Sequence, residues 1–269
     1  MDDGSIITVS IQINKQNRTA VIDFSGTSAQ TQNNLNTPLA VSRAAVLYVF
    51  RTLTRADIPL NDGCMEPLEL IIPTGSMLNP RAPAAVVAGN VETSQIIVDT
   101  LYRALNIMAA SQGTMNNFTF GDNEKQYYET ICGGSGAGRS FAGTDAIQTH
   151  MTNSRLTDPE ILESRFPVIL EEFSIRQNSG GTGEFKGGDG TVRRLRFLKP
   201  MSASILSNRR KIKPPGLNGG NDGACGANRL VRASGTIEEL DSTATVQVDC
   251  GDAIEIETPG GGGYGHLDR

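Results

Sequence analysis

The residues best suited to chemistry in this 269-residue chain lie in four short polar segments, of which the first is the glycine-rich run 132–138, CGGSGAG. Glycine lets backbone N–H groups approach an anion closely, so Gly134, Ser135, Gly136 and Gly138 predict either an anion cradle or a tight structural loop. The run matches neither the dinucleotide nor the P-loop fingerprint, because no apolar helix follows it directly and no G-K-[ST] sequence is present. Ala137 stands where the nucleophile-elbow pattern requires a final glycine.

The second segment, 111–117 (SQGTMNN), is rich in carboxamides. Each Asn or Gln side chain offers both a donor and an acceptor, which suits recognition of a lactam, an amide or a carboxylate. Asn116 and Asn117 are therefore candidate substrate contacts. Helix capping and turn formation are the alternative role of such a run.

The third segment, 89–95 (GNVETSQ), leads into a predicted helix. Glu92 near a helix N-terminus gains from the helix dipole, which is one reason for its presence. In the functional interpretation, Asn90 and Glu92 line a pocket and the same helix end attracts an anionic group. Gln95 is a further candidate substrate contact.

The fourth segment, 149–153 (THMTN), holds His150, one of only two histidines in the chain, together with Asn153. The other histidine, His266, lies in the glycine-rich tail and is expected to be exposed. Two histidines exclude a three-histidine zinc site within this chain. A Ser-His-Asp triad would have to use His150, and no sequence pattern identifies its serine.

The elements that must position these segments follow from the spacing of apolar residues. Alternation over 6–13 and 18–24, with turn residues at 14–17, predicts a hairpin. Helical spacing over 38–55, with Pro38 in the first turn, predicts an amphipathic helix. A strand is expected at 68–72, a second helix at 93–110 capped by Thr93 or Ser94, strands at 118–120 and 127–132, and a short helix after residue 158.

After residue 165, short strand-like runs alternate with glycine-rich turns, which suggests a compact β-barrel or sandwich. The runs are at 168–175, 191–197, 202–206, 230–231 and 253–257. We therefore predict an α+β, β-rich fold. Residues 1–165 form an α+β part with mixed sheet and two main helices, and residues 166–269 form the glycine-rich β part.

Composition narrows the possible partners. The net charge of −5 argues against nucleic acid. No apolar run reaches 18 residues, so no membrane span is expected. The four cysteines show no C-x-x-C pair, which favours reduced thiols and a cytoplasmic location.

Eight short motifs in collinear order resemble the hydantoinase B/oxoprolinase family across essentially the whole chain. They are DFSGT (23–27), DIPLN-x-GC (57–64), AVVAGNVETSQ (85–95), SQGTMNNFTFG (111–121), YYETICGGSGAG (127–138), THMTN-x-R-x-TDPE (149–160), GGDGTVR (187–193) and TPGGGGYG (258–265).

The resemblance implies an ATP-dependent hydrolase of a lactam or imide, such as 5-oxoproline in glutathione metabolism, or a hydantoin. An actin-like A half would bind ATP and Mg and phosphorylate the carbonyl oxygen, and the B half would complete hydrolysis. In that chemistry the glycines of 134–138 would hold the anion, Asn116 and Asn117 would recognise the amide, and His150, Glu129 or Glu92 would move protons. Asn90, Gln95 and Asn153 complete the expected substrate contacts.

The resemblance also implies missing parts. Family B parts are about twice as long, and their N-terminal portion carries His- and Asp-rich segments associated with a metal. We therefore expect this chain to be a C-terminal fragment or split subunit that works in an oligomer with the A half and the rest of the B half. Gln148 stands where the family commonly has a histidine forming H-T-H with His150. A related ATP-dependent carboxylase subunit and a non-catalytic assembly module are the alternative functions.

Overall fold

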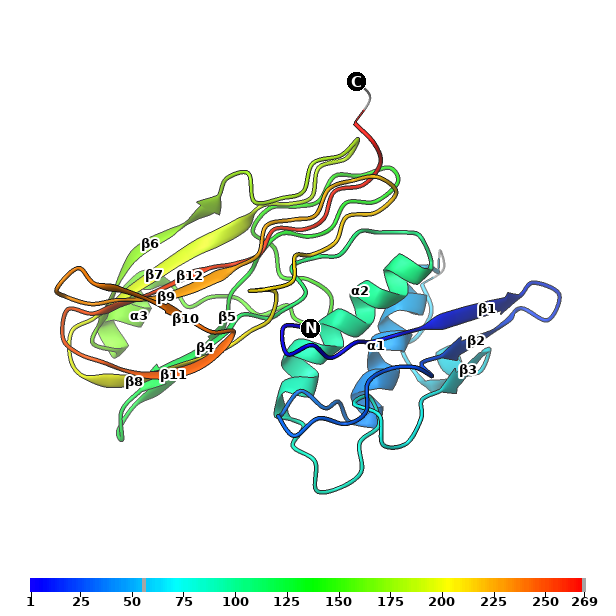
Figure 1. Cartoon of the computed structure of the whole chain (residues 1–269), viewed down its shortest axis with the longest axis horizontal. Helices are drawn as coiled ribbons and strands as arrows, with labels where there is room; N and C mark the ends of the chain where they lie inside the picture. The colour runs from blue at the N-terminus through cyan, green and yellow to red at the C-terminus, as the bar shows by residue number, and fades with distance from the viewer. Residues whose placement is uncertain (55–56, 268–269) are drawn as a thin grey trace. The chain divides into compact units, whose positions relative to one another are not determined.

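The computed structural model describes residues 1–54 and 57–267 (Figure 1). Arg55, the last residue of the first predicted helix, lies outside these ranges. The chain separates into two compact units. The first contains Met1 and residues 3–107, and the second contains Asp2 and the residues from Met108 onward. None of the helices in the described ranges has the length and apolar character needed to cross a lipid bilayer.

The first unit pairs a small sheet with two helices. The sheet has the order β1 (Ser10–Asn14), β2 (Thr19–Asp23), β3 (Leu68–Ile71), with β1 antiparallel and β3 parallel to β2. A 3₁₀ turn, η1 (Asp62–Met65), precedes β3. The predicted hairpin is confirmed, but β1 is mostly exposed rather than half-buried, and Ile13 is 61% exposed. Ala20 and Ile22 of β2 supply the buried face.

Helix α1 (Leu39–Thr52) confirms the predicted amphipathic helix, with Pro38 at its N-cap. Its buried positions, Ser42, Ala45, Val46 and Val49, follow the i, i+3, i+4, i+7 spacing of one helix face.

The second helix differs at both ends from its prediction. Helical conformation begins at Val87, passes through a π-helical turn, η2 (Gly89–Thr93), and continues as α2 (Ser94–Ala104). Neither Thr93 nor Ser94 caps it, since both are in helical conformation. A Cβ on Gly89 would overlap the carbonyl oxygen of Asn36, so glycine permits this close approach. Asn106, with φ of 57°, lies just beyond the helix end.

The second unit is built on two antiparallel sheets. One has the order β10 (Ile237–Leu240), β9 (Ala227–Val231), β12 (Ala253–Glu257), β7 (Gly190–Phe197), β6 (Val168–Arg176). The other has the order β11 (Thr243–Val248), β8 (Met201–Leu206), β4 (Asn117–Gly121), β5 (Gln126–Thr130). The short helix expected after residue 158 is present as α3 (Pro159–Arg165), and the side chain of Asp158 caps it.

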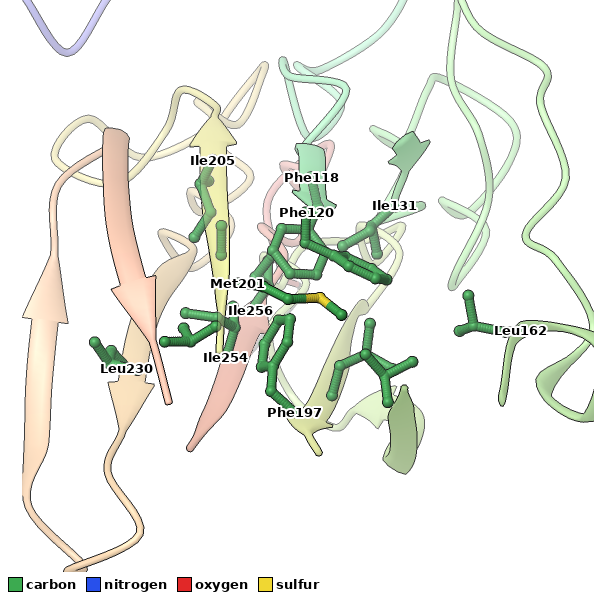
Figure 2. Close-up of a cluster of buried hydrophobic side chains, with 14 residues drawn as sticks. Phe118, Phe120, Ile131, Leu162, Phe197, Met201, Ile205, Leu230, Ile254 and Ile256 are labelled. Carbon is green, nitrogen blue, oxygen red and sulfur yellow. The ribbon is translucent and has the colours of Figure 1, made fainter. Parts of the chain in front are cut away.

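Side chains from both sheets share one apolar core (Figure 2). Phe118, Phe120 and Met201 come from the four-stranded sheet, and Phe197 and Ile254 come from the five-stranded sheet. The Phe120 ring meets Phe197 edge-on, with centroids 5.5 Å apart. The described residues therefore form an α+β fold with three α-helices and twelve strands, and the sandwich form of the β part is the one adopted.

The division of the chain differs from the expected boundary near residue 165. β4 and β5 precede that point, yet β4 pairs with β8, which follows it, so the sheet ties both sides together. The separation between compact units falls instead between Ile107 and Met108. Two strands, β10 and β11, lie outside the predicted set.

The glycine-rich segments of the second unit form an assembly of extended chains rather than separate turns (Figure 1). Gly181 N–H donates to Gly261 O (2.8 Å), Gly261 N–H to Gly188 O (2.9 Å) and Gly188 N–H to Ser135 O (2.9 Å). A Cβ on Gly134 would overlap the Gly188 carbonyl, and one on Gly261 would overlap that of Ser135. The close packing of backbones explains the glycine content.

Candidate functional site

A buried carboxamide network lies in the second unit, where the segment 111–117 meets β5. Asn116 is 0% exposed and has a positive φ of 47°. Its Nδ2 donates to Gln112 Oε1 (2.7 Å) and to the carbonyl oxygen of Ile131 (3.1 Å). Its Oδ1 accepts from Arg210 Nη1 (2.9 Å). Asn116 and Gln112 of the carboxamide run are therefore bonded to each other, and both ends of Asn116 are held by protein partners.

Arg210 anchors this network to two further segments. Its Nε and Nη2 both donate to Asn228 Oδ1, at 3.1 and 2.8 Å. The backbone amides of Arg210, Lys211 and Ile212 all donate to the carboxylate of Asp2, at 2.7, 3.2 and 3.1 Å. Three consecutive amides converging on one carboxylate form an anion nest, here occupied by the chain itself. Arg210 is thus held in place by contacts within the second unit, whereas the Lys211 side chain remains largely exposed.

Gln112 is the member of the network with an unused donor. The residue is 0% exposed, and its Nε2 has no hydrogen-bond partner. The backbone N–H of Gln112 donates to Gly134 O (2.8 Å). A Cβ on Gly133 would overlap Gln112 Oε1, so the glycine makes room for this side chain.

Asn117, at the start of β4, is 4% exposed and is also occupied. Its Nδ2 donates to Leu206 O (2.8 Å), and its Oδ1 accepts from the Tyr128 hydroxyl (2.7 Å). Tyr128 itself is 54% exposed. These contacts join β4 to its two neighbouring strands through side chains as well as backbone.

Glu129 is bound in a buried ion pair, which argues against the proton-moving role expected for it. Arg193 Nε donates to Oε1 (2.6 Å) and Nη2 to Oε2 (2.8 Å), and both side chains are 2% exposed. Burial, together with the adjacent Glu129 carboxylate, raises the pKa of Tyr127, whose hydroxyl donates to Oε2 (3.0 Å). Both carboxylate oxygens are thus engaged, and the pair cross-links β5 and β7.

The backbone amides of 134–138 also have partners within the chain. Gly134 donates to Pro259 O (3.0 Å), Ala137 to Gly262 O (2.9 Å) and Gly138 to Phe141 O (3.0 Å). The amides of Ser135 and Gly136 are likewise bound, the first to Thr144 O and the second to Ser111 Oγ. Of the two interpretations of this run, the contacts favour the tight structural loop.

The segment 149–153 is only partly enclosed. His150 is half-buried with φ of 53°, a strained value for a histidine, and Asn153 is exposed. Gln148 Nε2 donates to Thr130 O (3.0 Å), so this residue is tied to the end of β5. The strained backbone at His150 is the kind of feature that functional sites retain.

In the first unit, a polar stripe runs from η2 into α2, and most residues of α2 are buried. Glu92, Gln95 and Asp99 are 0%, 0% and 4% exposed and are spaced by three and four residues. Asn90 is exposed, in contrast to the pocket expected around it. Glu92 lies in the first turn of η2, two residues before α2 begins, so its predicted place near a helix N-terminus agrees with the start of η2. π-Helical turns such as η2 occur frequently at functional sites.

Several residues of these networks were absent from the sequence-based candidates, among them Gln112, Asp99 and Arg210. Gln112 lay within the predicted carboxamide run, and Asp99 could have been found from its seven-residue spacing to Glu92. Arg210 bonds Asn116 across 94 positions, a contact that no local pattern signals. Among the described residues, no three His, Cys, Asp or Glu side chains come together so as to hold a metal ion.

Comparison with known proteins adds three findings. The family model for hydantoinase B/oxoprolinase matches residues 1–267. The 5-oxoprolinase 1 of Arabidopsis thaliana is 52% identical over 265 residues, an alignment that covers 98% of this chain and 21% of that protein. The chain therefore spans about a fifth of the length of this curated relative.

Two solved structures share the fold. The ATP-dependent caprolactamase from Pseudomonas jessenii superposes with a TM-score of 0.84 at 23% identity, covering 97% of this chain and 48% of that one. A nucleotide-free acetone carboxylase gives a TM-score of 0.86 at 18% identity, covering 97% and 41%.

Proposed function

This chain belongs to the hydantoinase B/oxoprolinase family, and from that premise we propose that it forms part of the hydrolytic half of an ATP-dependent enzyme that opens a cyclic amide. The proposed reaction converts 5-oxo-L-proline, ATP and water to L-glutamate, ADP and phosphate. The observation that carries this proposal is the 52% identity to a 5-oxoprolinase over 98% of the chain. Hydantoins are the alternative cyclic substrates of the same chemistry.

The chemistry of the reaction explains the kinds of side chain required. A lactam carbonyl carbon is a poor electrophile, and phosphorylation of its oxygen by ATP makes it open to attack by water. What remains is to orient the ring, stabilise the tetrahedral species and protonate the leaving nitrogen. Buried carboxamides suit the first task. We propose His150 for proton transfer and, in the first unit, Glu92 as a further proton-moving group.

Asn117 and, in the first unit, Gln95 remain proposed substrate contacts. A contact from Asn117 would replace its hydrogen bond to Leu206 O or to the Tyr128 hydroxyl. Asn90 and Asn153 are exposed, so a contact from either would be made at the surface. Asn116 holds the network together and reaches substrate through its neighbours.

ATP and Mg belong, in this proposal, to an actin-like partner half rather than to this chain. Any metal belongs to the N-terminal portion of the B half, whose His- and Asp-rich segments the family resemblance associates with a metal. The free cysteines Cys64, Cys132, Cys225 and Cys250 are consistent with a reducing, cytoplasmic setting for an oligomeric enzyme.

The test is turnover by the complete enzyme that contains this chain. We expect glutamate and phosphate to form together from 5-oxoproline, with neither product formed without ATP. Failure to release 5-oxoproline-dependent phosphate from a complete preparation would reject the substrate. A carboxylase would instead require bicarbonate and a ketone, so bicarbonate-independent turnover separates the two activities.

The assembly-module alternative is tested by two single variants, His150→Ala and Asn117→Ala. Loss of turnover with the complex intact supports a role in the site. Loss of assembly alone supports scaffolding.

A further inference from the structure

Arg210, Asn116 and Gln112 form a hydrogen-bond chain whose direction is set by its first member. A guanidinium group only donates. Arg210 Nη1 donates to Asn116 Oδ1, which fixes the opposite end of that carboxamide as the donor. Asn116 Nδ2 then donates to Gln112 Oε1 at 2.7 Å. Gln112 is thereby committed as an acceptor through Oε1, and its Nε2 becomes the terminal donor of the chain.

That terminal donor has no partner, although Gln112 is 0% exposed. Exchanging Oε1 and Nε2 does not repair this, because two NH₂ groups would then meet at Asn116. A buried donor without an acceptor bears its full desolvation cost, and native proteins retain one where a ligand or an ordered water completes it.

The surroundings hold the donor in one place. The Gln112 backbone is bonded to Gly134 O, and the side chain fits against Gly133 only because that residue lacks a Cβ. Arg210 is itself fixed by Asn228 and by the Asp2 nest. A donor oriented before the ligand arrives loses little entropy on binding.

We propose that Gln112 Nε2 is a ligand-binding donor that hydrogen-bonds an oxygen atom of the substrate, with Asn116 and Arg210 as positioning residues. The identity of the ligand rests on the proposed function. A cyclic amide such as 5-oxoproline offers two acceptors of this kind, the ring carbonyl and the carboxylate. Because Nε2 is buried in this structure, the ligand oxygen can reach it only if neighbouring protein atoms move aside on binding.

The substitution Gln112→Glu tests the donor selectively in the complete enzyme. It keeps the Oε1 acceptor for Asn116 and replaces only Nε2 with oxygen. We expect kcat/KM for 5-oxoproline to fall by about 30- to 1000-fold, because an oxygen would then face the substrate oxygen. A kcat/KM within about threefold of the wild-type value overturns the proposal. That result would indicate that Nε2 bonds a water molecule, because a water molecule can turn and donate to Glu instead.

A matched control is Gln30→Glu, because Gln30 Oε1 also accepts a hydrogen bond, from the backbone N–H of Arg81 (2.8 Å). It should retain wild-type kcat/KM. Competition by 2-pyrrolidone, which has the ring carbonyl but no carboxylate, identifies the acceptor. If the inhibition constant of 2-pyrrolidone rises in Gln112→Glu, the acceptor is the ring carbonyl. If that constant is unchanged while kcat/KM for 5-oxoproline falls, the acceptor is the carboxylate.

A structure of the wild-type enzyme with 5-oxoproline covers the case in which the variant does not fold. A ligand oxygen within about 3.2 Å of Nε2 supports the proposal, and a water or no atom there overturns it. If the wild-type enzyme does not hydrolyse 5-oxoproline, the proposed function fails. If it does and Gln112→Glu behaves like wild type, only this inference fails.

Discussion

Replacing Glu129 with Gln separates a structural role from a catalytic one. The carboxylate receives two hydrogen bonds from Arg193, at 2.6 and 2.8 Å, in a location where both side chains are 2% exposed. Gln keeps the size of the side chain but leaves the guanidinium charge buried without a counter-charge. Breaking such a pair from one side costs about 3–5 kcal/mol.

The magnitude can be stated as a melting temperature. For a domain of 150–250 residues, about 1 kcal/mol corresponds to 2–4 °C, so Glu129→Gln should lower Tm by about 6–20 °C. Thermal unfolding followed by circular dichroism measures this directly. The double variant Glu129→Gln/Arg193→Met should recover most of the loss, because it removes the unpaired charge as well.

Two results would refute this reasoning. An unchanged Tm for Glu129→Gln would mean that the pair does not stabilise the sandwich. An unchanged Tm together with lost turnover would restore Glu129 as a proton-moving residue.

Three further outcomes follow from the structure. Gly261→Ala should lower Tm by several degrees, because its Cβ would overlap a backbone carbonyl. The control Gly235→Ala has no atom within 4 Å of its Cβ, so it should cost only the strain of its positive φ, about 1–2 kcal/mol. His150→Gly should leave Tm within a few degrees, since glycine accepts φ of 53°, yet lower kcat by about 10²- to 10⁴-fold if the imidazole moves protons; unchanged kcat would remove His150 from the mechanism. Burial alone would raise the pKa of Asp189, but Lys186 and the Gly180 amide more than offset it and hold that pKa below its ordinary 3.8. The stability that Asp189 contributes is therefore present above about pH 4 and is lost as the pH falls further. In Asp189→Asn, Tm measured by circular dichroism should therefore fall less steeply with decreasing pH than in the wild-type protein.

The elements that sequence reasoning found are those whose apolar spacing is set by one buried face. Helix α1 shows this clearly, with Ser42, Ala45, Val46 and Val49 on the core side. β10 lacked the signal because three of its four residues are exposed, and its place depends on pairing with β9. β11 does carry the period-2 signal, since TATVQV alternates exposed and more buried positions, and sequence reasoning overlooked it. The π-helical turn η2 was not predicted because it accompanies a tertiary contact, the close approach of Gly89 to Asn36, which no local sequence pattern signals.

The candidate site divides in the same way. The carboxamide run and the Glu92 segment could be located from residue type. Their partners could not, because Arg193 bonds Glu129 across 64 positions and Arg210 bonds Asn116 across 94. The high glycine content indicates turns or close approach of another group to the backbone, but it does not say which group approaches. The tertiary arrangement shows that around Gly134 the approaching groups are backbone atoms, including the Gly188 carbonyl, rather than an anion.

The central claim is that this chain belongs to an enzyme that uses ATP to hydrolyse a cyclic amide. The most direct test is to run the complete enzyme with 5-oxoproline and ATP in ¹⁸O-enriched water and analyse the product by mass spectrometry. The account predicts glutamate that carries ¹⁸O in its side-chain carboxylate and forms only when ATP is present. Absence of labelled glutamate, or its formation without ATP, would contradict the account.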